Sequence, residues 1–401
     1  MQDGDKPRAG IAIVLPTLVI LLMLAAGPIS SGLSSTQILP ASDHFDGKLF
    51  YNPTALQPQA SSQQTQPNRG ILSYAWRWLI ATDRPEWPAV ENVTPGPKPA
   101  FRVVGGTIRI TPVGHATFLI QMDGLNLLTD PIWSERCSPV SWAGPKRHRP
   151  PGLRFEDLPP IDAVLISHNH YDHLDRPTLK RLAEKGVTRA LTPLGNSELI
   201  RDEGIRDVTE LDWWQSVAVS NDVRITLVPA QHFSSRTPWD RNEALWGGFV
   251  ISGPSGNIYY AGDTGYGAHF KEIARRFSPI RAALLPISPF RPQQMKTEQP
   301  RIFSIVHMGP LEAIAAHVDL GAKRSIAAHF QVFQLGWDGF DDAVNELSAN
   351  LKKRAFTPDD FLAPAPGRPI ELGTSLSEKD NPSGMAASVT ACLQPVGKKH
   401  F

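Results

Sequence analysis

Three histidines and an aspartate lie within six consecutive residues of this chain, in the order His168-x-His170-x-Asp172-His173. They directly follow the apolar run 163–166, which has the length and composition of a buried strand. Imidazole and carboxylate groups are the ligands that suit zinc and related divalent metals. The motif therefore predicts a metal site in a loop at the end of a strand, and the fold must bring further ligands to that loop.

Other ligand-type residues stand one to four positions after other apolar runs, and they are His232, Asp263 and His329. A single histidine or aspartate after a strand is usually a cap or a turn residue. Four strand ends that all carry such residues indicate that the strands converge on one edge of the fold.

The candidate ligands are five histidines and two aspartates, which is too many for one tetrahedral ion. We therefore expect two Zn²⁺ ions, although other divalent metals can use the same ligands. The first ion is assigned His168, His170 and His232, the second ion Asp172, His173 and His329, and Asp263 bridges them. Two nearby metals would lower the pKa of a bridging water, so that a hydroxide attacks the substrate. Asp172 and Asp263 are thus candidate catalytic residues.

Composition narrows the possible partners. The 40 Lys and Arg residues nearly balance the 39 Asp and Glu residues, which argues against nucleic acid as the main partner. The two cysteines, Cys137 and Cys392, cannot form a disulfide framework or a cysteine-based zinc site, and whether they pair is left open.

The pattern along the chain predicts four parts. Residues 1–31 resemble a signal peptide or a membrane anchor, because Lys6 and Arg8 precede the apolar run Ile11 to Ala26. A buried apolar helix is the alternative for this run. Residues 32–70 are expected to form a linker and N-terminal extension, 71–372 the folded domain and 373–401 a flexible tail. The folded domain would then lie outside the cytoplasm, either secreted or tethered to the membrane.

Short apolar runs alternate with helical patterns in the central part, which predicts a mixed α/β architecture with helices outside the sheets. The expected strands are 107–113, 117–122, 125–129, 163–167, 223–228, 247–251, 257–261, 282–286 and 324–328. The expected helices are 177–184, 196–203, 268–276, 310–319 and 340–351.

The His-x-His-x-Asp-His motif resembles that of the metallo-β-lactamase superfamily. This resemblance implies a four-layer αββα sandwich with a dimetal site at one edge of its two sheets. Several other segments resemble the family of N-acyl-phosphatidylethanolamine-hydrolysing phospholipase D and its bacterial relatives. They include the segments 114–117, 129–132, 144–147, 158–175, 210–214 and 261–266, and the match covers roughly residues 44 to 363.

The narrower resemblance implies cleavage of a membrane phospholipid, N-acyl-phosphatidylethanolamine, to phosphatidic acid and an N-acylethanolamine. It also implies that Asp130 orients a ligand histidine, and that His307 faces the pocket, where it contacts the phosphate or the leaving group. Capping or packing is the alternative role for His307. His115 is expected to be structural, in a Gly-His turn.

The chain departs from the family pattern at residues 286–292 and again after His329. These departures leave the substrate open, and the alternatives are those of a lactonase or esterase or of a hydrolase of soluble phosphodiesters. Two other classes are a redox di-iron protein, since the same ligand types can hold iron, and a membrane-tethered binding protein without catalysis. The basic run 146–149 is either a solvated loop or a contact for anionic lipid head groups. The tryptophans at 133, 142, 213, 214 and 239 belong either to the core or to a membrane interface.

Overall fold

The computed structural model describes residues 41–53, 84–90, 93–291 and 305–373. The expected signal or anchor segment, the C-terminal tail and Cys392 lie outside the described residues. Within the ranges that the structure covers, no helix is both long and apolar enough to cross a membrane.

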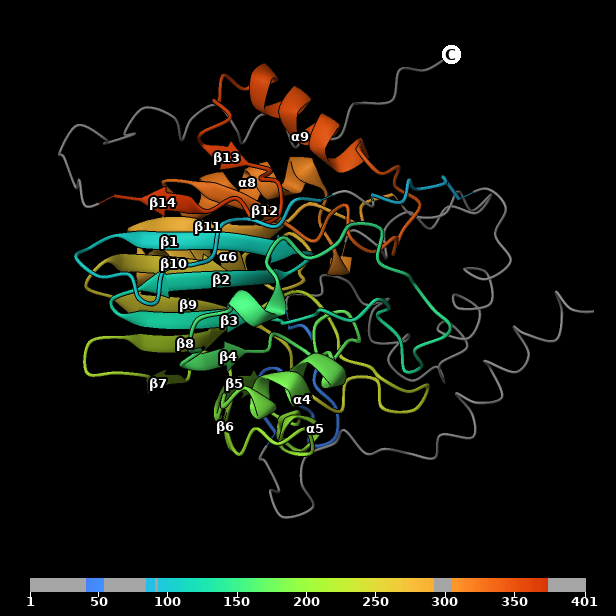
Figure 1. Ribbon diagram of the computed structural model, residues 1–401, viewed down its shortest axis with the longest axis vertical. Coiled ribbons are helices and arrows are strands. Elements are labelled where there is room, and N and C mark those ends of the chain that lie inside the picture. Colours follow the sequence, from blue (N-terminus) through green and yellow to red (C-terminus); the bar gives the residue numbers. More distant parts are fainter. Residues whose placement is uncertain (1–40, 54–83, 91–92, 292–304, 374–401) are drawn as a thin grey trace, which may run out of the picture.

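Two seven-stranded sheets pack face to face (Figure 1). The first sheet has the order β14-β1-β2-β3-β4-β5-β6, and the second has the order β13-β12-β11-β10-β9-β8-β7. The strands of the first sheet are β1 (Ile108–Gly114), β2 (Thr117–Met122), β3 (Leu125–Thr129), β4 (Ala163–Leu165), β5 (Arg189–Pro193), β6 (Asp207–Leu211) and β14 (Ile370–Leu372). Those of the second sheet are β7 (Ser216–Ala218), β8 (Arg224–Val228), β9 (Gly248–Gly253), β10 (Gly256–Tyr260), β11 (Ile280–Pro286), β12 (Ser325–Ala328) and β13 (Phe361–Leu362).

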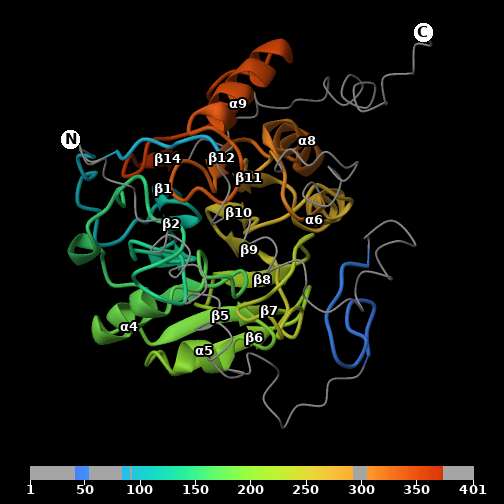
Figure 2. The same cartoon turned by 90° about the vertical axis from the view of Figure 1, so that its right-hand side faces the viewer.

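Helices cover the outer face of each sheet, which gives the expected four-layer αββα sandwich (Figure 2). The first sheet is covered by α4 (Arg176–Glu184) and α5 (Ser197–Arg201), whose apolar side chains share a cluster with that sheet. The second sheet is covered by α6 (His269–Phe277), α8 (Pro310–Leu320) and α9 (Asp342–Lys353). A short 3₁₀ helix, η1, spans Phe155–Asp157. Every predicted strand and helix is present, with its ends moved by at most two residues.

Strand directions explain why ligand-type residues meet. The strands β3, β4 and β5 are parallel, and β1 runs with β3 because both are antiparallel to β2. In the second sheet β10, β11 and β12 are parallel, and β8 runs with β10 because both are antiparallel to β9. The carboxyl ends of these strands therefore lie at one edge of the sandwich, and the loops that follow them carry the candidate site.

The core between the sheets is built from the inward faces of both sheets together with an N-terminal segment. Phe45 and Phe50 are buried in this cluster. His44 places Nε2 2.7 Å from the Asp212 carboxylate, and its ring stacks on Trp213 with the ring centroids 4.3 Å apart. Residues 41–53, which fall within the expected linker, are thus packed into the sandwich.

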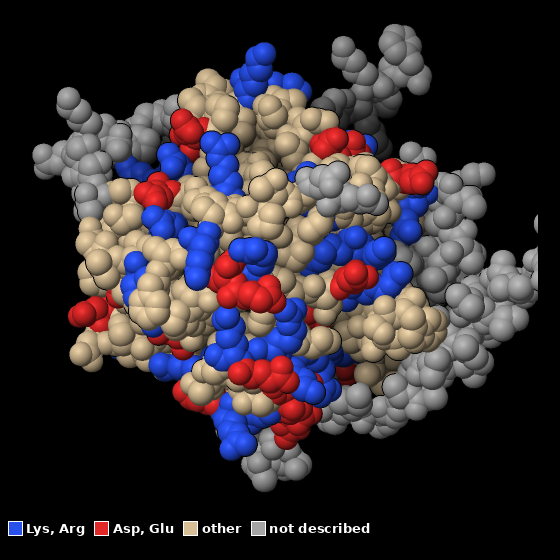
Figure 3. Space-filling view, in the orientation of Figure 1, with Lys and Arg blue, Asp and Glu red and all other residues tan. Residues whose placement is uncertain are grey.

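The exposed surface carries charges of both signs. On the face shown in Figure 3, Lys and Arg side chains alternate with Asp and Glu side chains without a large patch of one sign. The pairs Arg109–Glu371 and Arg176–Glu203 are examples at the sheet edge and on α4. Exposed pairs of this kind add little to stability, so burial between the layers supplies most of it.

One buried histidine in the helical layer makes stability depend on pH. His317 on α8 lies 2.8 Å from the Ser325 hydroxyl, and burial lowers its pKa from 6.5 to about 4. The unfolded chain therefore binds a proton at this residue between about pH 6.5 and pH 4, whereas the folded chain does not. We predict that His317 alone lowers the free energy of unfolding by about 1.4 kcal/mol per pH unit as the pH falls through this window.

Urea unfolding of the wild type and of His317→Gln, measured from pH 7.5 to pH 4.5, tests this prediction. The stability advantage of the wild type should shrink as the pH falls. Parallel pH profiles for the two proteins would contradict the prediction.

Candidate metal centre

Four ligand atoms from both sheets surround one position at the common edge. Asp172 Oδ2 lies 3.3 Å from His173 Nε2 and 3.2 Å from His329 Nε2. Asp263 Oδ2 lies 3.4 Å and 3.2 Å from the same two nitrogens. Atoms that bind one tetrahedral ion at about 2.0–2.2 Å are separated by roughly 3.3–3.5 Å, so the spacing fits a metal.

Unpaired polar atoms inside the cluster also indicate a cation. Asp263 Oδ1 and His173 Nε2 are buried and have no hydrogen-bond partner among the described residues. Two carboxylates, Asp172 and Asp263, lie within one buried group of imidazoles. Buried charges that lack partners are costly, and a bound divalent ion would satisfy them.

Three histidines form a second group beside the first. His170 Nδ1 lies 2.8 Å from His168 Nε2 and 3.2 Å from His232 Nε2, and all three rings are close enough to hold one ion. Asp263 Oδ2 lies 3.8 Å from His232 Nε2, so this carboxylate stands between the two groups. The structure thus brings the seven candidate ligands to one edge of the sandwich, in two neighbouring groups.

The electrostatics favour metal-binding protonation states at the two carboxylates and at some of the histidines. Burial alone would raise the pKa of Asp172, but the charge of His173 and hydrogen bonds from neighbouring imidazoles hold it well below its usual range. Burial and nearby imidazoles oppose each other in the same way at Asp263, whose pKa is also lowered. Burial lowers the pKa of both His170 and His232 to about 3. Ionised carboxylates and neutral imidazoles are the forms that coordinate metals.

Although burial opposes it, the Asp263 and Asp172 carboxylates raise the pKa of His173 well above its usual value and that of His329 to about 9. A metal bound to this group would therefore displace a proton from each of these two rings.

Asp130 occupies the position expected for a residue that orients a ligand. His173 Nδ1 donates to Asp130 Oδ2 over 2.7 Å, which leaves His173 Nε2 facing the cluster. Ser167 donates from its backbone N–H at 2.7 Å and from its hydroxyl at 2.5 Å. The Tyr260 hydroxyl, on β10 of the other sheet, also donates to Asp130. Hydrogen bonds of this kind fix the tautomer and the direction of a ligand histidine.

A partly buried arginine supports the ligand loop. Arg236 donates from Nη1 to the backbone carbonyls of Asn169 and Leu174, at 2.7 Å and 3.0 Å, and its guanidinium stacks 4.0 Å from the centre of the Tyr171 ring. Arg236 therefore closes the loop that carries the central motif. The sequence offered no signal for this role, because an arginine some sixty residues downstream has no special spacing.

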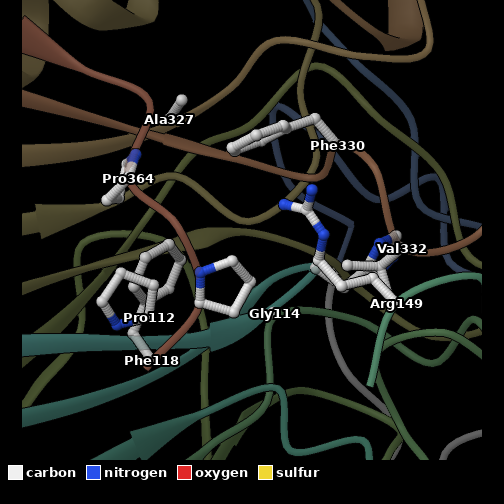
Figure 4. Close-up of a pocket in the computed structure, with 10 residues that line it drawn as sticks. Pro112, Gly114, Phe118, Arg149, Ala327, Phe330, Val332 and Pro364 are labelled. Atoms are coloured by element: carbon white, nitrogen blue, oxygen red, sulfur yellow. The ribbon is translucent and has the colours of Figure 1, made fainter. Parts of the chain in front are cut away.

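His115 was expected to be structural and buried in a Gly-His turn; it is buried in that turn, and it also contacts a candidate ligand. Its Nε2 lies 2.9 Å from Asp172 Oδ2, and its ring centroid is 3.9 Å from that of His329. The residue belongs to the same metal-competent group as Asp172, His173 and His329. His115 also lines a small pocket, into which the Arg149 side chain projects toward Phe330 (Figure 4).

His307 faces the cluster rather than capping a helix. Its Nδ1 lies 3.7 Å from Asp263 Oδ2, and its ring centroid is 5.1 Å from that of His232. Helix α8 begins after Gly309, whose N–H donates to the Glu312 carboxylate over 3.2 Å. His307 therefore lies beside the ligand cluster and outside helix α8.

The basic run 146–149 divides between the interior and the surface. Arg147 donates to the carbonyls of Ile132 and Ser134 at 2.8 Å and 3.1 Å, and burial lowers its pKa to about 10. Arg147 therefore stabilises the backbone at residues 132–134, whereas Lys146 is exposed.

Comparisons with known proteins agree with this architecture. Residues 125–330 match the family model described as "Beta-lactamase superfamily domain". An uncharacterized protein of Mycobacterium tuberculosis is 33% identical over 373 residues, which cover 90% of this chain and 94% of the relative. The "N-acyl-phosphatidylethanolamine-hydrolyzing phospholipase D 1" of Caenorhabditis elegans is 36% identical over 307 residues, which cover 73% of this chain and 83% of the relative.

A solved structure shares the fold at lower identity. The isothiocyanate hydrolase from Delia radicum gut bacteria superposes with a TM-score of 0.51 at 20% identity, covering 67% of this chain and 100% of that one. At this identity the likeness concerns the fold alone.

The contacts of Asp130 generate a prediction about metal affinity. Asp130→Asn keeps the shape of the side chain but removes the charge that holds His173 Nδ1–H. We expect metal affinity to fall about 10–100-fold, the usual cost of losing such a partner. Competition with a chromophoric chelator measures it. Asp222→Asn, at an exposed loop position, is the matched control and should bind metal like the wild type. Equal affinity in Asp130→Asn and the wild type would refute the assigned role.

Proposed function

The chain belongs to the beta-lactamase superfamily, and we propose that it is a phosphodiesterase of the phospholipase D type. Its substrate is N-acyl-phosphatidylethanolamine, and its products are phosphatidic acid and an N-acylethanolamine. The observation that carries the proposal is the complete cluster of five histidines and two aspartates, in a chain 36% identical to a protein that bears this activity in its name. We propose two Zn²⁺ ions as the metals.

The reaction consumes one water molecule. Oxygen from water bonds to phosphorus, the bond from phosphorus to the ethanolamine oxygen breaks, and a proton ends on that leaving oxygen. Bound divalent metals supply a water of lowered pKa and neutralise charge on the phosphoryl oxygens. The remaining steps fall to side chains of the chain itself.

His307 is placed to act on the leaving side. Its ring stands at the rim of the cluster, beside Asp263 and His232. Burial lowers the pKa of His307 to about 3, so the ring is neutral near pH 7 and carries one N–H. A neutral imidazole in hydrogen-bond reach can donate to a phosphate oxygen and relay a proton to the departing alcohol.

The second candidate is a hydrolase of the same fold that acts on lactones, other esters or soluble phosphodiesters. It is favoured by the segment 286–292, which departs from the pattern of the lipid enzymes. Asp338 accepts hydrogen bonds from the Ser288 hydroxyl at 2.8 Å and from the Arg291 N–H at 2.6 Å, so this segment is held in a defined conformation. Residues 292–304, which follow it in the sequence, lie outside the described residues.

We also propose a phospholipid bilayer as the surface on which the enzyme works. Five large apolar side chains are exposed within the described ranges. Three of them lie in segments that follow strands ending at the edge of the sandwich that carries the candidate metal site, here called the metal edge. Trp142 (47% exposed) follows β3, Trp239 (51%) follows β8 and Ile305 (43%) follows β11. Tryptophan side chains of this kind suit the boundary between lipid and water.

Charge complementarity supports the same surface. Asp240 is buried and accepts hydrogen bonds from the backbone N–H groups of Arg236 and Thr237, so its charge is turned inward. The neighbouring Trp239 and Arg241 are exposed. This loop therefore presents an aromatic ring and a cation outward, a combination that fits anionic lipid head groups. The apolar run 11–26 would carry the domain to the extracytoplasmic side of the membrane.

Assay of the full chain against N-acyl-phosphatidylethanolamine in mixed micelles tests the activity. Mass spectrometry should detect phosphatidic acid and N-acylethanolamine, and a chelator should abolish both until Zn²⁺ is restored. We expect Asp263→Ala to lose at least about 100-fold in rate, because removing a ligand costs more than removing its partner. His317→Gln, far from the cluster, should retain activity. Cleavage of lactones or soluble phosphodiesters without cleavage of the lipid would favour the second candidate.

Fluorescence quenching by brominated phospholipids tests the bilayer surface in the full chain. Trp142→Phe combined with Trp239→Phe should lose most of the lipid-dependent quenching seen in the wild type. Arg241→Gln should weaken binding to phosphatidylglycerol vesicles about fivefold, since one cation near an anionic surface contributes ~1 kcal/mol. Phe101→Trp, exposed before β1 and away from the metal edge, is the control and should add unquenched emission. Equal quenching in the double variant and the wild type would remove this surface from the proposal.

A further inference from the structure

Two histidines at the metal edge share an uncommon backbone conformation. His115 has φ of 58° and His329 has φ of 62°, both in the left-handed region that non-glycine residues rarely occupy. The conformation costs on the order of 1 kcal/mol or more at each residue, and it persists where the surrounding structure imposes it. The His329 N–H donates to the His115 carbonyl over 2.9 Å, which joins the end of β12 to the end of β1. His115 therefore follows a strand of the first sheet, and His329 follows a strand of the second.

The strained turn directs the His115 ring toward the ligand group that contains Asp172, His173 and His329. Strand β1 ends at Gly114 and β2 begins at Thr117, so only two residues form the connection. The His115 ring is buried, with its centroid 3.9 Å from that of His329 and 5.5 Å from that of His173. Its Nε2 lies 2.9 Å from Asp172 Oδ2. The His115 side chain therefore contacts the candidate ligands directly.

The number of ligands separates two possible roles for His115. The four atoms assigned to the second metal position are 3.2–3.4 Å apart across each measured pair, and they already complete the set for one tetrahedral ion. The contact between His115 Nε2 and Asp172 Oδ2, at 2.9 Å, has the length of an N–H···O hydrogen bond. A carboxylate oxygen has two lone pairs, so Asp172 can accept this bond and still bind a metal.

We propose that His115 is a positioning residue of the second metal position, which holds the Asp172 carboxylate by a hydrogen bond and does not itself bind the metal. His115 would thus orient Asp172 by a hydrogen bond, in the same way that Asp130 orients His173. Both ligands of the second position that come from the central motif are oriented by a residue at the end of another strand of the first sheet. The proposal concerns metal binding and does not depend on which substrate the enzyme cleaves.

The hydrogen-bond partners of the ring agree with this role. Asp172 is an acceptor, which places a hydrogen on Nε2. The other ring nitrogen, Nδ1, is buried and has no hydrogen-bond partner within the described part of the chain, as expected for the nitrogen that carries only a lone pair.

Metal titration of the full chain tests the proposal. The variants are His115→Ala, which removes the donor, and His115→Gln, whose side-chain amide can replace it. His317→Ala is the matched control, because His317 is also buried and also pairs with one side chain. Chelator competition measures the affinity of each of the two ions, and the visible absorption of Co²⁺-loaded protein reports the coordination number at the second position.

We expect His115→Ala to weaken the second ion about 10–100-fold and to leave the first ion unchanged. His115→Gln should restore most of the affinity, and the Co²⁺ spectrum of both variants should keep the wild-type coordination number. His317→Ala should lower stability without changing either affinity.

Three results would overturn the proposal. The first is wild-type affinity for both ions in His115→Ala. The second is a Co²⁺ spectrum that loses a ligand in His115→Ala and is not restored in His115→Gln, which would make His115 a ligand. The third is a wild-type chain that binds only one ion. None of these readouts uses a substrate, so a failed lipid assay would leave the proposal standing.

Discussion

The buried carboxylate of Asp130 is the interaction on which the site depends. It is inaccessible to solvent, and an isolated charge at such a position would cost several kcal/mol. Its acceptors are satisfied by Ser167 and His173 from the loop after β4 and by Tyr260 from β10. One charge therefore ties the first sheet to the second and turns a ligand histidine toward the cluster. Losing any of these donors would leave part of a buried charge unpaired.

The sandwich turns this local interaction into a site by bringing strand ends together. The predicted ligands follow β4 in one sheet and β8, β10 and β12 in the other. A metal bound here would cross-link the two sheets, so its binding energy would also be folding energy. The same argument applies to the paired left-handed histidines, whose backbone hydrogen bond joins β1 to β12. Strain at the site is offset by contacts that only the assembled sandwich provides.

The strands that sequence patterns revealed differ physically from those that they missed. Every expected strand is a run of apolar residues that is buried in the sandwich. Four of the five missed strands, β6, β7, β13 and β14, are the edge strands of the two sheets. They are short and partly exposed, as in Ser216–Ala218, where no residue is buried. Edge strands pair on one side only and need little apolar surface, so periodicity cannot separate them from loops. The fifth, β5, is internal but is bounded by Arg189 and Pro193.

The site was predictable to the extent that its residues follow buried strands. That rule located His232, Asp263 and His329, and applied consistently it also reaches His115, which stands two residues after an expected strand. The Gly-His pair predicted a turn with a buried histidine of structural role, and the residue is buried there. The sequence does not show that a two-residue turn forces φ to 58° and folds the imidazole inward. Nor can spacing along a chain distinguish a ligand from the donor that holds a ligand, because both stand just after a strand and face the same cluster.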